Sequence, residues 1–141
     1  MEKSMGKGIV ILAAITFLLF SSCQTMGVGG PVVWDDSIPA DKLATVQFIN
    51  MKVDSFNGIG VEKFNWVEIP AGEATLGADV TIYHAGVNFR ANGMEFTCNF
   101  REGKTYKVSG GVNDMRWGVN VYEDGELRAF VPFKEPPVFT N

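Results

Sequence analysis

Ala74-Thr75-Leu76-Gly77-Ala78-Asp79-Val80-Thr81-Ile82-Tyr83 is the stretch that decides the fold of this chain. From Ala74 to Ile82 its apolar residues occupy every second position and alternate with glycine or polar residues. Successive side chains of a β-strand point to opposite faces, so this alternation over ten residues predicts a strand with one buried face. Residues 94–100 repeat the same alternation after a short interval, which predicts a second strand of the same kind.

Similar patterns continue on both sides of these two strands. Further strands are predicted at 44–53, 59–64, 105–108, 115–121 and 127–133, with a short one at 87–90. Residues 65–69 either continue the strand 59–64 or start another. The apolar face changes between Phe48 and Ile49, which predicts a bulge or bend there.

Turn signals separate the predicted strands. Asn57-Gly58 and Asp124-Gly125 are strong hairpin signals, Asn92-Gly93 predicts another turn, and Gly110-Gly111 predicts a break. Pro136-Pro137 is expected to end regular structure.

Together these patterns predict an all-β fold: an antiparallel β-sandwich, or a small barrel, of seven or eight strands after an N-terminal signal helix. The expected domain spans 41–135 and is followed by a loose tail, 136–141. The inward positions are taken to include Cys98, Met115, Trp117 and Leu127.

The first 22 residues have a different composition. Lys3 and Lys7 precede an uncharged apolar run over residues 9–20, which small residues close. A basic start, a short apolar segment and small residues at its end predict a secretory signal. The run is short for a membrane span, which needs about 20 residues, and a buried helix or signal anchor is the alternative.

Leu19-Phe20-Ser21-Ser22-Cys23 resembles the lipobox of bacterial lipoproteins. In that family the cysteine receives a diacylglyceryl group and the signal is cut just before it. The resemblance therefore implies lipidation at Cys23 and attachment to a membrane by acyl chains rather than by a spanning helix. Residues 23–40 would then be the lipidated cysteine and a tether that is Gly-rich where it begins. Gln24 is not the aspartate that retains some lipoproteins at the inner membrane, so the family rule favours the outer membrane of the cell envelope.

Removal of the signal changes the charge of what folds. The whole chain of 141 residues carries a net charge of −4, and residues 23–141 carry 10 basic and 15 acidic residues, which gives −5. This acidic balance argues against a nucleic-acid partner.

Only two cysteines are present, Cys23 and Cys98. A lipidated Cys23 leaves Cys98 without a disulfide partner, and its place in an alternating strand predicts a core position. If Cys23 is not lipidated, a Cys23–Cys98 disulfide becomes possible.

Residues for catalysis are scarce. His84 is the single histidine and is expected at the surface, and it has no second histidine or cysteine at metal-ligand spacing. Glu123, Asp124 and Glu126 surround a turn, where like charges indicate solvation. We therefore expect no enzyme activity, no metal and no cofactor; an enzyme built around His84 ranks last among the functions considered.

Aromatic residues suggest a binding surface instead. Several of them fall near strand ends or on the face opposite the predicted core; they are Trp34, Trp66, Tyr83, Tyr122 and Phe130. Exposed aromatics on a sandwich stack on sugars or anchor protein partners. Trp66, Tyr83 and Tyr122 are the candidate ligand-binding residues, and the alternative is that these side chains fill the core.

Two further segments resemble a recurring arrangement. Ile69-Pro70-Ala71-Gly72-Glu73 precedes one strand, and Phe96-x-Cys98-x-Phe100-x-x-Gly103-Lys104-x-Tyr106-x-Val108 follows it. This arrangement is similar to that of small uncharacterised bacterial lipoproteins and surface domains with transthyretin- or immunoglobulin-like sandwiches. The resemblance implies a fold and an envelope location, and it carries over no catalytic residue.

The sequence therefore favours a lipid-anchored envelope module with a structural or protein-binding role. The alternative is a surface lipoprotein that binds a glycan or a small hydrophobic ligand.

Overall fold

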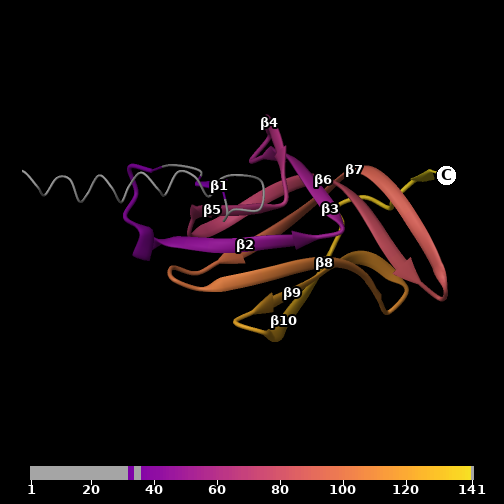
Figure 1. Cartoon of the computed structure of the whole chain (residues 1–141). Helices are drawn as coiled ribbons and strands as arrows, with labels where there is room; N and C mark the ends of the chain where they lie inside the picture. The colour runs from indigo at the N-terminus through magenta and orange to yellow at the C-terminus, as the bar shows by residue number, and fades with distance from the viewer. Residues whose placement is uncertain (1–31, 34–35, 141) are drawn as a thin grey trace, which may run out of the picture. The chain divides into compact units, whose positions relative to one another are not determined.

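Two β-sheets pack against each other in the computed structural model, which describes residues 32–33 and 36–140 (Figure 1). These residues belong to a compact unit that spans Val32–Asn141. The expected signal helix, the lipidated Cys23 and the tether up to residue 31 lie outside the described residues. Neither sheet closes on itself, so the fold is an all-β sandwich and not a barrel.

The first sheet has six strands in the order β1-β5-β2-β8-β9-β10. Their bounds are Val32–Val33, Trp66–Pro70, Leu43–Ile49, Thr105–Asn113, Arg116–Glu123 and Glu126–Pro132.

The second sheet has five strands in the order β11-β7-β6-β3-β4. Their bounds are Phe139–Thr140, Val87–Phe100, Gly72–His84, Met51–Phe56 and Ile59–Phe64. The one short helical turn in the described part, η2, covers Ala40–Lys42.

The core lies between the two sheets. The predicted inward face of β6 is confirmed, because its alternate residues from Ala74 to Ile82 are all at most 3% exposed. Cys98 on β7 is also buried, as its alternation predicted. Phe100 and Tyr106 meet edge to face across the sheets, with ring centroids 4.9 Å apart. The period-two pattern thus identified the buried faces of the two central strands.

The change of face predicted near Phe48–Ile49 is the point at which the chain crosses from one sheet to the other. β2 ends at Ile49, Asn50 adopts a positive φ of 58°, and β3 begins at Met51 in the second sheet. Asparagine tolerates this left-handed conformation better than most residues. At Asn65 the chain crosses back from the second sheet to the first, between β4 and β5, so a new strand begins in the range 65–69.

Two features of the strand pairing differ from the prediction. The described part has eleven strands rather than seven or eight, because the crossings split strands and two short edge strands are added. The sandwich is also not wholly antiparallel: β2 pairs with β8 in parallel, and β1 pairs with β5 in parallel. Alternation reports which face a residue occupies and carries no information on strand direction.

The turn predicted at Asn92-Gly93 and the break at Gly110-Gly111 are wrong. Gly93 has a φ of 67° and lies within the continuous strand β7, where its N–H donates to the Asp79 carboxylate at a register shift opposite β6. Glycine supplies the left-handed residue that such a bulge requires. Gly110 and Gly111 lie within the continuous strand β8, and close packing against Ile82 requires the glycine at position 110.

The inward assignments of Met115 and Leu127 are also wrong. Met115 is 92% exposed, because Asp114 and Met115 form the tip of the β8–β9 hairpin with φ angles of 57° and 66°. Leu127 is 62% exposed and precedes a register shift between Leu127 and Ala129 that reverses its face. Asp124-Gly125, by contrast, makes the predicted hairpin between β9 and β10.

The end of the chain contains more regular structure than predicted. Within the expected loose tail 136–141, Phe139–Thr140 form β11, which pairs with Ala91 and Arg90 of β7. Phe139 packs edge to face on Trp117 with centroids 4.6 Å apart, so an aromatic contact holds this segment in place.

Candidate functional site

Trp66 and Tyr122 lie on the same outer face of the six-stranded sheet. The residues next to them in sequence, Val67 and Val121, are buried in the core. Successive side chains of a strand point to opposite faces, so the two aromatic side chains face away from the core. The strand register places Trp66 beside Gln47, and places Lys107 beside both Gln47 and Tyr122. Two of the three predicted binding residues therefore share one row across the sheet, roughly 14 Å apart at three strand spacings.

We call this row, which continues onto β10, the outer-face row. Its members lie on β5, β2, β8, β9 and β10 in that order; they are Trp66, Gln47, Lys107, Tyr122 and Leu127. The adjacent row on the same face contains Ile49, Ser109, Asn120 and Phe130. A shallow cavity of about 270 Å³ is lined by residues of both rows, among them Ile49, Lys107 and Tyr122.

Tyr83 does not join this surface. It lies near the end of β6 in the other sheet, where it is 71% exposed. Trp34, another of the five aromatics considered, lies outside the described residues. The structure thus separates the predicted binding residues into one pair and one isolated tyrosine.

The prediction that Trp117 lies inside the core is wrong, because this residue lies at the border of the core. It is half-buried and packs on Phe89 and Phe139 with ring centroids 5.1 and 4.6 Å away. Exposed His84 is T-shaped to the same indole, with ring centroids 5.8 Å apart. These aromatic rings close one end of the sandwich.

Glu123 is a candidate functional residue that was not predicted from the sequence. It is 8% exposed, although its position beside a turn suggested solvation. Arg101 binds it through two N–H groups, with Nε 2.9 Å from Oε2, and the Tyr106 hydroxyl donates to the same oxygen at 2.6 Å. Arg128 completes the set with its Nη1 3.0 Å from Oε1. The missed signal was alternation, because Glu123 follows Val119 and Val121 on the inward face.

This arrangement fixes the charge of the carboxylate. Hydrogen bonds from Arg101 and then from Tyr106 lower the pKa of Glu123 from 4.5 to about 2. Burial, followed by the hydrogen bond to Glu123, raises the pKa of Tyr106. At neutral pH the cluster therefore holds one carboxylate, two guanidinium groups and one neutral phenol.

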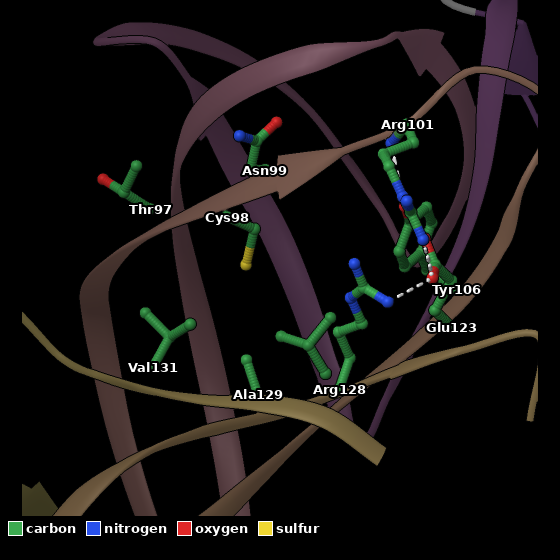
Figure 2. A pocket seen from close by; sticks show the side chains of 10 residues that line it. Thr97, Cys98, Asn99, Arg101, Tyr106, Glu123, Arg128, Ala129 and Val131 are labelled. Atoms are coloured by element: carbon green, nitrogen blue, oxygen red, sulfur yellow. Dashed lines mark hydrogen bonds and ion pairs between the residues drawn. The ribbon is translucent and has the colours of Figure 1, made fainter. Parts of the chain in front are cut away.

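A cavity of about 390 Å³ adjoins this cluster between β7 and β10 (Figure 2). Its apolar lining comes from Cys98 on β7, Val121 on β9, and Ala129 and Val131 on β10. Figure 2 shows the Cys98 sulfur pointing into this space and the Arg128 side chain reaching across it towards Glu123. The cavity thus has an apolar part and one charged end.

Cys98 is a free thiol with little chemical reactivity in the folded state. Burial raises its pKa to about 12, and the thiolate is the reactive form of cysteine. Its place in the cavity is therefore that of an apolar lining residue.

Two negative findings concern only the described residues. Residues 32–33 and 36–140 contain no group of three or more His, Cys, Asp or Glu side chains placed to hold a metal ion. The same part of the chain contains no helix that is long and apolar enough to cross a bilayer.

Comparisons with protein-family models, with curated proteins and with solved structures found no significant match to this chain.

Proposed function

We propose that this chain is a lipid-anchored cell-envelope module that binds a protein partner through the outer face of its six-stranded sheet. The single observation that carries the proposal is the outer-face row, which places Trp66 and Tyr122 on one solvent-facing surface. Aromatic side chains that remain partly accessible supply large contact areas at protein interfaces.

The anchor part of the proposal rests on sequence. A basic start, an apolar run and the lipobox-like stretch ending at Cys23 support export and lipidation. The acyl chains would hold the sandwich at the outer membrane, which leaves the outer-face row available to a neighbour in the envelope.

The test compares two double substitutions, one on the outer face of the six-stranded sheet and one in the other sheet. Full-length chain is crosslinked in intact cells, and the partners it captures are compared among wild type, Trp66→Ala/Tyr122→Ala and the control Tyr83→Ala/Val87→Ala. We expect the first pair to lose a specific crosslinked protein that the control retains, because Tyr83 and Val87 lie in the other sheet. Equal capture by both pairs would exclude the outer face as the binding surface.

A glycan is the second candidate ligand for the same surface. Gln47 and Lys107 lie between the two aromatic residues, and Ser109 and Asn120 lie in the next row. Aromatic faces with hydrogen-bonding groups beside them suit a sugar, whose rings have apolar faces and polar edges. A glycan array probed with wild type and Trp66→Ala distinguishes the two ligands, since a glycan site would show a specific sugar signal that Trp66→Ala loses.

A further inference from the structure

One edge of the five-stranded sheet is only partly covered. β11 pairs with β7 at Arg90 and Ala91, and the Lys134 N–H donates to the Glu95 carbonyl at 2.9 Å. Past Glu95, no strand in the described part of the chain pairs with β7 on the side away from β6. Residues 96–100 therefore form an open edge.

The backbone of this open edge has unused hydrogen-bonding groups. The Glu95 carbonyl and the Arg101 N–H both point away from β6, since they bond to Lys134 and, at 2.8 Å, to the Tyr106 hydroxyl. In an antiparallel strand such groups recur at every second residue, so Thr97 and Asn99 also direct their N–H and C=O groups outwards. No described residue bonds to these four groups.

The strand across the cavity is protected against pairing, and β7 is not. β10 has a register shift between Leu127 and Ala129, and its outward edge includes Pro132, which has no N–H. Bulges and prolines are the usual protection of edge strands. Residues 95–99 contain no proline, no lysine and no register shift.

The cavity beside this edge offers room for side chains. Its 390 Å³ lie next to Cys98 on β7 and to Ala129 and Val131 on β10 (Figure 2). A strand added to β7 would place alternate side chains over this apolar lining.

The charge at one end of the cavity selects among peptides. Arg101 and Arg128 both bind the single carboxylate of Glu123, so the three side chains together carry a net charge of +1. Several of the guanidinium N–H groups are not used by Glu123. Glu126 faces Glu123 in the hairpin register, but it is exposed, so solvent screens its charge.

We propose that an extended peptide segment of a partner protein adds to the β7 edge at Thr97–Asn99 as an antiparallel strand. A small apolar side chain of the peptide enters the cavity, and an acidic residue at its N-terminal end meets Arg101 and Arg128. The direction is that of β11, which already runs antiparallel to β7. This site is separate from the outer-face row and stands independently of it.

The experiment uses the full-length chain in lipid nanodiscs and a fluorescent capped peptide, Glu-Val-Thr-Val-Thr. Anisotropy compares it with a Lys-Val-Thr-Val-Thr peptide and with two copies that are N-methylated on one or the other alternate set of residues. We expect saturable binding of the acidic peptide, weaker binding of the lysine peptide, and loss of binding for one N-methylated copy. Equal binding of all four peptides, or no saturable binding of the acidic one, would overturn the proposal.

Matched variants locate the site. Thr97→Pro removes an outward N–H that β6 does not use and should weaken binding about tenfold or more, whereas Thr97→Val keeps this N–H and should change affinity less than about twofold. Arg128→Gln should weaken binding of the acidic peptide only. If Thr97→Pro fails to fold, hydrogen exchange of wild type decides: slower exchange at Thr97 and Asn99 with the peptide supports the site, and unchanged exchange contradicts it. Loss of peptide binding in Trp66→Ala/Tyr122→Ala would instead assign the peptide to the outer face.

Discussion

At the scale of single residues, Glu123 combines burial with full hydrogen bonding. Its two oxygens receive four hydrogen bonds or ion contacts, from Arg101, Tyr106 and Arg128. Removing one member of such a cluster leaves the remaining members without a hydrogen-bond partner. The resulting loss of stability is larger than the stability that the original contacts contribute. Alternation along β9 could have indicated that Glu123 is buried. Its partners could not be predicted, because they come from β8, β10 and the turn after β7, and only the folded register brings them together.

The pKa of Glu123 predicts a pH dependence of stability. A carboxylate whose folded pKa is about 2, against its usual 4.5, stabilises the fold above pH 4.5 and loses this contribution as the pH falls towards 2. We expect Glu123→Gln to unfold at a lower temperature than wild type at pH 7, and the gap to shrink between pH 4.5 and 2. Thermal unfolding followed by circular dichroism measures this difference in unfolding temperature. Glu126→Gln, the same change at an exposed position, is the control, and a gap that stays constant with pH would contradict the assignment.

At the scale of elements, glycines have two structural roles that the sequence does not distinguish: they form turns, or they allow a close contact inside a strand. Gly58 and Gly125 terminate strands as predicted, with φ angles of 84° and 90° in two-residue hairpins. Gly110 lies inside β8, and a Cβ there would fall 2.4 Å from Cγ1 of the buried Ile82 on β6. Its need for glycine arises from a contact between the two sheets, which local sequence does not encode.

This contact predicts a large effect of a small substitution. Gly110→Ala should destabilise the fold by about 1–3 kcal/mol, because the added methyl overpacks the core against Ile82. Gly60→Ala on β4 is the matched control, since nothing lies within 4 Å of its added Cβ, and it should stay within about 0.5 kcal/mol. Urea unfolding measures both. In the double variant Gly110→Ala/Ile82→Ala the two costs should be less than additive, and full additivity would refute the contact.

At the scale of the whole molecule, the sequence predicted the fold class and the buried faces of β6 and of residues 94–100 in β7. These follow from period-two alternation, which is a local property. The parallel pairing of β2 with β8, the crossings at Asn50 and Asn65, and the cavity between β7 and β10 depend on contacts between distant segments. The shared face of Trp66 and Tyr122 likewise needed the register of four strands.

The proposed anchor has a chemical test that uses both cysteines. Cys98 is buried and its pKa is about 12, so a thiol reagent should reach it only after unfolding. Chain purified from membranes should therefore show no reactive thiol when folded and one in denaturant if Cys23 carries lipid. One thiol when folded and two in denaturant would contradict lipidation, and no thiol in either state would indicate a Cys23–Cys98 disulfide. Cys23→Ser should also release the protein from membranes or block its processing.

The parallel pairing of β2 with β8 has a consequence for how the chain folds during synthesis. Thr45 and Thr105 are register partners, so joining them closes a loop of 60 residues, at a cost of roughly 4 kcal/mol in chain entropy. Contacts this far apart in sequence slow folding to the millisecond-to-second range. Until residues beyond 105 have left the ribosome, β2 has no partner on that side. The nascent chain must therefore be kept from other unpaired strands until its last quarter is made.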